Sequence, residues 1–156
     1  MIHPTAIIDV DAVLGQNVEI GPYCVVGQGV VLGDDVVLKS HVVIRGPSNI
    51  GRGVQIYQFA TVGEDTPALA YEGEDSVLEV GEGTIIREGV TIHRGMAKRG
   101  IQKTIIGSNC LLMAYVHVGH DCIVGNNGIM ANNASLSGHV EVGDFANFGG
   151  YSGVPQ

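Results

Sequence analysis

Every sixth residue of this chain is apolar over most of its length. Counting from Ile2, the register runs unbroken to Val62, and it resumes over residues 80–92 and 106–154. A helix would repeat near 3.6 residues and an isolated strand every second residue. A strict period of six therefore indicates a short strand and a turn that repeat as one unit. We predict an all-β solenoid whose interior holds the period-six side chains.

A second periodic position lies two residues before each of these and is usually occupied by a small side chain. Because side chains alternate between the two faces of a strand, both positions point into the same interior. Large and small side chains then share a narrow core, which is typical of a parallel β-helix. The three cysteines occupy this position, so we expect them to fill core space rather than form disulfides or bind zinc. The small positions are Ala6, Ala12, Val18, Cys24, Val30, Val36, Val42, Ser48, Ala60, Cys110, Cys122, Ala134 and Ala146.

Polar triplets that begin with glycine follow many of the apolar positions. They read GQN, GDD, GEG, GSN and GNN. Gly, Asn and Asp tolerate a positive φ better than other residues, and a solenoid needs such residues where the chain turns. We expect these triplets to form the corners between strands.

Charge and hydropathy exclude two classes of partner. The net charge of −8 argues against nucleic acid, which requires a basic face. No apolar stretch is long enough to span a bilayer and no secretory leader is recognisable, so we expect a cytoplasmic protein. A local basic cluster could attract a phosphate or an acidic protein, or could simply be solvated. It consists of Arg87, Arg94, Lys98, Arg99 and Lys103.

Two segments break the register and predict loops that project from one domain spanning residues 1–156. The first covers about residues 64–79 and the second about residues 94–105. Insertions in solenoids usually lie on a functional face. Ile92 and Ile106 are 14 residues apart, two more than a pair of hexads. If only those two residues loop out, the hexads that begin at Ile92 and Leu112 stack on each other.

Stacked coils bring distant histidines together. With three hexads in a coil, His120 and Gly138 lie about one strand spacing apart, ~4.8 Å, and His139 follows directly. The same stacking places His93 and His117 on one side of the solenoid. His3 and His41 belong to no such group, and we expect them to be structural or merely exposed.

Five longer strings resemble the hexapeptide-repeat family of acyl-carrier-protein-dependent UDP-N-acetylglucosamine O-acyltransferases, which act first in lipid A biosynthesis. The strings are KSHVVI (39–44), IYQFATVGE (56–64), IREGVTIHRG (86–95), HVGHDCIVGN (117–126) and ANNASLSGHVEVGDFA (131–146). The resemblance implies a left-handed parallel β-helix and a homotrimer with active sites between subunits. The hand comes from the resemblance alone, because general crossover rules favour the right hand.

The resemblance also implies roles for individual residues. His120 matches the general base that takes the proton of the sugar 3-hydroxyl, as an imidazole can near neutral pH. Asp121 matches the carboxylate that orients it, and the backbone N–H of Gly138 matches the donor that stabilises the oxyanion. The acyl donor is carried on the phosphopantetheine of acyl carrier protein, and no metal or other cofactor is implied. Residues that match positions contacting the UDP-amino sugar are His93, His117, His139 and Gln156.

Three departures from the family pattern keep alternatives open. Ala68 and Ala70 stand where the family has an acidic and a basic residue, and Pro155 stands where it has a further histidine. These replacements favour a related transferase with another sugar nucleotide or acyl donor. Family members continue beyond the position of Gln156 with more coils and a helical domain, so we expect either a shortened natural member, a fragment, or a chain whose trimer protects that end. A truncated, non-catalytic trimeric homologue is therefore a third possibility.

A zinc site is the main competing interpretation of the histidines. The β-helix carbonic anhydrases bind zinc with three histidines across a subunit boundary, and imidazole is a preferred zinc ligand. In that family two ligands are five residues apart, whereas His117 and His120 are three apart. We therefore predict a site without a metal.

Overall fold

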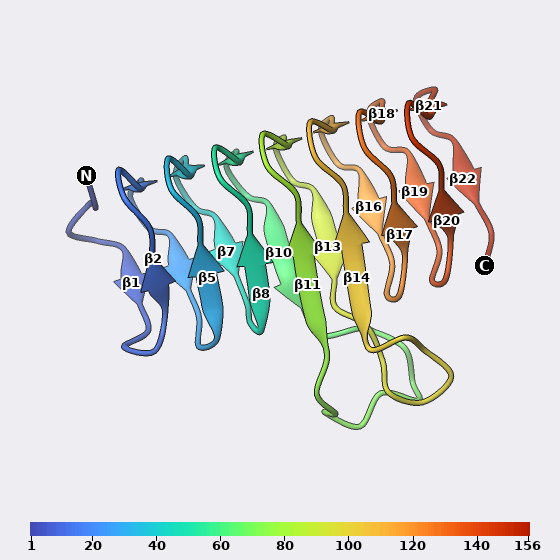
Figure 1. Cartoon of the computed structure of the whole chain (residues 1–156), viewed down its shortest axis with the longest axis horizontal. Helices are drawn as coiled ribbons and strands as arrows, with labels where there is room; N and C mark the ends of the chain where they lie inside the picture. Colours follow the sequence, from blue (N-terminus) through green and yellow to red (C-terminus); the bar gives the residue numbers. More distant parts are fainter.

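The computed structural model describes residues 1–156 as a three-sided rod built from 22 short strands (Figure 1). It contains no helix of the length and apolar character that a membrane crossing needs. Each side of the rod is one parallel sheet, and consecutive strands belong to different sheets. The chain ascends one side, crosses the top and descends behind as it advances, so the rod is a left-handed parallel β-helix. This is the hand that the family resemblance predicts.

We call the three sheets face 1, face 2 and face 3. Face 1 contains β1 (Ile7–Ile8), β4 (Val25–Val26), β7 (Val43–Ile44), β10 (Thr61–Glu64), β13 (Thr91–His93), β16 (His117–Val118), β19 (Ser135–Leu136) and β22 (Gly153–Val154). Face 2 contains β2 (Val13–Leu14), β5 (Val30–Leu32), β8 (Ser48–Ile50), β11 (Val77–Val80), β14 (Lys103–Ile106), β17 (Ile123–Val124) and β20 (Glu141–Val142). Face 3 contains β3 (Glu19–Ile20), β6 (Val37–Leu38), β9 (Gln55–Ile56), β12 (Ile85–Ile86), β15 (Leu111–Leu112), β18 (Ile129–Met130) and β21 (Asn147–Phe148).

The interior is the predicted double ladder of large and small side chains. The large positions are buried from Ile20 to Leu136, and so are most of the small ones, the three cysteines included. Ladder residues of the first and last coils described, such as Ile8 and Val154, are only partly buried. Burial raises the pKa of the Cys122 thiol, as expected of a core residue rather than a reactive one.

The predicted corners are confirmed at the level of single dihedral angles. The third residue of each polar triplet has a positive φ, between 55° and 68°: these are Asn17, Asp35, Gly83, Asn109 and Asn127. The sequence did not reveal that larger residues adopt the same conformation at the other corners. Tyr23, Phe59 and Tyr115 have φ near 60° and are mostly exposed.

The inserted segments lie side by side on one corner of the rod, where they form the two large loops of Figure 1. Loop 1 comprises residues 65–76, between β10 and β11, and loop 2 comprises residues 94–102, between β13 and β14. Residues 77–79 and 103–105, which we expected to be loop, belong instead to two of the longest strands. They extend the parallel pairing between β11 and β14 to the base of both loops.

The predicted stacking of the hexads at Ile92 and Leu112 is wrong. Ile92 pairs with Val118, 26 residues later, and Leu112 pairs with Ile86. An ordinary coil advances 18 residues, so loop 2 removes a longer segment from the ladder than the two residues that we assumed. The error arose because the spacing of 14 was interpreted as two hexads plus two residues, whereas Ile92 and Ile106 occupy consecutive faces.

Candidate active site

Most of the predicted site residues gather at the corner that joins face 1 to face 2. His120 and Asp121 form the turn between β16 and β17, and Gly138 and His139 form the turn one coil later. Both loops leave the same corner, from the coils that precede His120. Val154 pairs with Leu136, so the register places Gln156 one coil beyond Gly138 on this corner.

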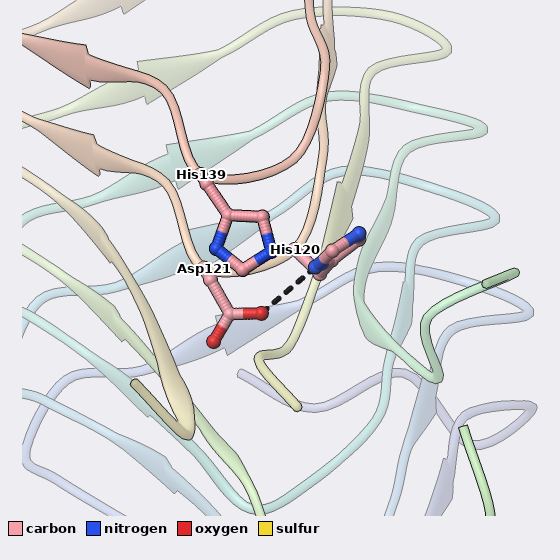
Figure 2. Close-up of side chains that lie close together, drawn as sticks. All are labelled: His120, Asp121 and His139. Carbon is pink, nitrogen blue, oxygen red and sulfur yellow. Dashed lines mark hydrogen bonds and ion pairs between the residues drawn. The ribbon is translucent and has the colours of Figure 1, made fainter. Parts of the chain in front are cut away.

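His120 and Asp121 form a hydrogen-bonded pair. His120 Nδ1 lies 2.8 Å from Asp121 Oδ2, and the carboxylate points toward the ring (Figure 2). The His120 side chain is 14% exposed, and that of Asp121 is fully buried. An ionised carboxylate only accepts hydrogen bonds, so the proton of the neutral ring resides on Nδ1. The Nε2 lone pair is left as a proton acceptor, which is the arrangement that a general base requires.

Loop 2 holds the Asp121 carboxylate from the other side. The backbone N–H of Met96 donates to both carboxylate oxygens at 3.1 Å, and that of Ile101 donates to Oδ1 at 2.8 Å. The Asp121 backbone N–H donates to the buried Thr104 hydroxyl at 2.9 Å. With φ at 58°, Asp121 adopts the same left-handed corner conformation as the asparagines of the triplets. The Asp121 carboxylate accepts hydrogen bonds from several donors, and these fix its orientation.

Gly138 lies close against the imidazole of His120. A Cβ atom on Gly138 would be 2.5 Å from His120 Nε2, closer than any side chain could remain without displacing the ring. The Gly138 N–H donates no hydrogen bond within the chain, although the adjacent His139 N–H donates to His120 O at 2.9 Å. The corner thus places an unused backbone donor beside the Nε2 atom of the candidate base.

The four clustered histidines form two pairs of rings. His139 meets His120 edge to face with ring centroids 4.9 Å apart, and His93 lies 5.3 Å from His117 on face 1. His117 Nδ1 shares a 2.8 Å hydrogen bond with the Thr91 hydroxyl. Burial, and secondly the nearby His93, lower the pKa of His117 and favour its neutral form.

The remaining residues singled out in the sequence lie outside the two pairs of histidine rings. Gln156 is exposed at the last coil, His3 is exposed at the first, and the ring of His41 stacks between Tyr23 and Phe59. The basic cluster is largely neutralised, because three of its members pair with carboxylates. These pairs are Arg87–Glu88, Arg94–Asp65 and Lys98–Glu72.

His120, Asp121 and His139 could also be considered as ligands of a metal ion, since their ligand atoms all lie within 4.8 Å of one another. The carboxylate already accepts hydrogen bonds from two backbone N–H groups and from His120. A metal would have to replace these donors at Asp121 before it could bind there. The donor set therefore suits a proton-transfer pair better than a metal centre.

Sequence reasoning missed two contributors to this corner. Arg94 counted only as one member of a basic cluster, but it is buried between the loops. The backbone N–H groups of Met96 and Ile101 leave no signal in the sequence, because their role depends on how loop 2 folds.

Comparison with known proteins identifies the repeat. The model of the bacterial transferase hexapeptide (six repeats) family matches residues 1–46 and 103–138. The chain belongs to this family. The matched segments exclude both inserted loops and include His120, Asp121 and Gly138.

More specific relatives are all UDP-N-acetylglucosamine O-acyltransferases. The acyl-[acyl-carrier-protein]–UDP-N-acetylglucosamine O-acyltransferase of Stutzerimonas stutzeri is 54% identical over 156 residues, and that of Saccharophagus degradans is 54% identical over 135 residues. The chain spans 60% of the length of the first and 52% of the second. The structure of LpxA from Acinetobacter baumannii matches 99% of the chain and 60% of its own, with a TM-score of 0.98 and 48% identity. The UDP-N-acetylglucosamine O-acyltransferase of Moraxella catarrhalis has a TM-score of 0.97 and 46% identity, covering 99% of this chain and 60% of its own.

Proposed function

We propose that this hexapeptide-repeat transferase moves an acyl group from acyl carrier protein to the 3-hydroxyl of UDP-N-acetylglucosamine, the first step of lipid A biosynthesis. The observation that carries the proposal is the corner at which a buried carboxylate orients His120 over the unused N–H of Gly138. The similarity to O-acyltransferases over the whole chain supports the substrates. We further propose that the protein acts in the cytoplasm, as a homotrimer.

In the proposed reaction, His120 Nε2 accepts the proton of the sugar 3-hydroxyl while the hydroxyl oxygen attacks the thioester carbonyl. Asp121 keeps the other ring proton on Nδ1 and stabilises the imidazolium that forms. The Gly138 N–H donates to the oxyanion of the tetrahedral intermediate. Collapse of the intermediate breaks the C–S bond, and the phosphopantetheine sulfur receives the proton back from His120. This chemistry requires neither a metal nor a covalent enzyme intermediate.

The remaining predicted residues serve to bind the nucleotide sugar in this proposal. His139 stands beside the base, His93 and His117 lie on face 1, and Gln156 lies one coil beyond Gly138. The neutral form of His117 suits hydrogen bonding to sugar hydroxyls, which act as both donors and acceptors.

The deciding experiment measures acyl transfer from a panel of acyl carrier protein thioesters to UDP-N-acetylglucosamine. His120→Ala should lower kcat by about 10²–10⁴-fold, the usual contribution of a general base. His41→Ala, which changes a histidine outside the cluster, is the matched control and should retain full turnover. Equal turnover of the wild type and the His120 variant would refute the assignment of the base.

A related transferase is the second candidate, favoured by the composition of loop 1. Ala68 and Ala70 lie in that loop next to Leu69, whose side chain is fully exposed, so residues 68–70 present apolar rather than charged groups. Turnover with another sugar nucleotide or acyl donor, but none with UDP-N-acetylglucosamine, would support this candidate. A folded protein without turnover on any pair would support a non-catalytic role.

A further inference from the structure

Arg94 is a cation enclosed between the two inserted loops. It follows β13 directly and begins loop 2, and its side chain is only 8% exposed. Nη1 donates to the backbone oxygen of Gly63 at 2.6 Å, and Nη2 donates to the Asp65 carboxylate and, at 3.2 Å, to the Tyr71 hydroxyl. All three acceptors belong to loop 1 or to the strand that enters it. One side chain of loop 2 therefore organises the course of loop 1.

Burying this charge carries a cost in hydration, so the contacts of Arg94 are better explained by the local geometry that they fix than by a gain in global stability. Arg94 Nε is buried and has no hydrogen-bond partner. A buried ion pair rarely gains more from its attraction than it loses in hydration, and an unsatisfied donor adds to the cost. A side chain that fixes geometry at the expense of stability is consistent with these contacts.

The same loop connects Arg94 to the candidate base. Two residues after Arg94, the Met96 N–H donates to Asp121, and the Met96 carbonyl accepts from the Gln102 N–H at 3.0 Å, which closes the loop on itself. The Ile101 N–H donates to the same carboxylate, which in turn holds His120. The contacts are continuous from loop 1 through Arg94 and loop 2 to the imidazole.

We propose that Arg94 is a positioning residue that locks loop 1 against loop 2 and thereby holds Asp121 in the orientation that His120 requires. The catalytic consequence rests on the proposed function, whereas the geometric one does not. Tilting the carboxylate would change the direction of Nε2, and small misplacements of a reacting group can reduce a rate about a hundredfold.

Lys98 provides a matched control within the same pair of loops. Its Nζ lies 2.7 Å from Glu72 of loop 1, so it also joins loop 2 to loop 1, but both side chains are more than half exposed. Exposed ion pairs contribute little because water competes for both partners. Arg94→Met should therefore loosen the loops, and Lys98→Met should not.

The first measurement is hydrogen exchange by mass spectrometry on the full chain. In Arg94→Met, peptides covering residues 65–76 and 94–102 should exchange at least about tenfold faster than in the wild type, with the strands unchanged. Lys98→Met should exchange as the wild type does. If Arg94→Met does not fold, Asp65→Asn removes the charge of an exposed partner while leaving the buried arginine in place. Unchanged exchange in both loops would overturn the proposal.

The second measurement follows His120 without requiring turnover. Diethylpyrocarbonate acylates accessible neutral imidazoles, and its rate at each histidine can be determined from peptide masses, with His41 as the internal reference. His120 should react at least about threefold faster in Arg94→Met, because a released loop 2 no longer fixes Asp121 beside it. An unchanged rate at His120 alongside loosened loops would mean that the connection ends at loop 2, and the proposal would fail.

Kinetics test the catalytic part. Arg94→Met should lower kcat about tenfold to a hundredfold with a much smaller change in the KM for sugar, and Arg94→Lys should recover part of the loss. A fall only in sugar affinity would overturn the positioning role. A wild type without turnover would count against the proposed function alone, since the exchange and acylation measurements would still decide the geometry.

Discussion

Two corners of the rod use the same chemistry in different ways. At the corner between face 2 and face 3, side-chain oxygens accept backbone N–H groups from the preceding coil. Asp34 accepts from Gln16 at 2.7 Å and Asp144 accepts from Asn126 at 2.7 Å, each across 18 residues. At the corner between face 1 and face 2, Asp121 accepts N–H groups across 25 and 20 residues, from loop 2. The arrangement at the first corner recurs along the rod, whereas the arrangement at the second occurs once, at Asp121.

The difference shows how a repeat protein creates a unique site. Asp144 is exposed, so water can replace its hydrogen bond, whereas the Asp121 carboxylate is buried and water cannot satisfy its donors. At the repeated corner, the stabilising hydrogen bonds are spread over many coils. At the corner that carries the loops, they converge on the Asp121 carboxylate, which fixes the orientation of His120.

The largest expected effect comes from breaking the interior ladder that supports both corners. Val118→Asp places a carboxylate at a fully buried position between the coils of the site, and it should abolish cooperative unfolding or cost more than about 4 kcal/mol. Val10→Asp, at a position that is 97% exposed, should stay within about 0.5 kcal/mol of the wild type. Circular dichroism during thermal unfolding measures both. A folded Val118→Asp protein would contradict the assignment of this residue to the core.

The second prediction compares the two corners directly. Asp121→Ala leaves the Met96 and Ile101 N–H groups without their acceptor, so it should lower the free energy of unfolding by about 2–4 kcal/mol. Asp144→Ala removes the same group from the exposed corner and should cost about 0.5–1 kcal/mol. Denaturant titration gives both values. Equal losses would mean that the buried acceptor is no more important than the exposed one.

The sequence predicted the repeated corner far better than the unique one. Period six located the interior positions, and the glycine triplets located the positive φ angles, because each coil repeats the same physical requirement. It also brought His120 close to Gly138, since an 18-residue coil fixes that pairing. The path of loop 2 could not be predicted, because it depends on tertiary contacts made by Arg94 and Asp121. For the same reason the stacking of Ile92 was assigned incorrectly.

The third prediction concerns the glycines of the two corners. Gly138→Ala would bring a methyl group within 2.5 Å of His120 Nε2, so the ring should move away and turnover should fall at least about tenfold. The cost in stability should stay below about 1 kcal/mol, because an imidazole can rotate to relieve the contact. Gly143→Ala is the control at the other corner, where a Cβ meets nothing within 4 Å. Assays and thermal unfolding of both variants test the prediction, which fails if Gly138→Ala retains wild-type turnover.

The smallest expected effect is a dependence of stability on pH that arises from His117, on the side of the rod that carries the loops. The fold lowers the pKa of His117, through burial first and His93 second, so this imidazole binds a proton less readily in the folded protein than in the unfolded chain. The stability contributed by neutral His117 is therefore complete above its unfolded pKa, about 6.5, and is lost as the pH falls below that value. His117→Asn should lose less stability between pH 7.5 and pH 5 than the wild type. Denaturant midpoints at both pH values measure the difference. Parallel pH profiles for the wild type and His117→Asn would place the acid sensitivity elsewhere in the molecule.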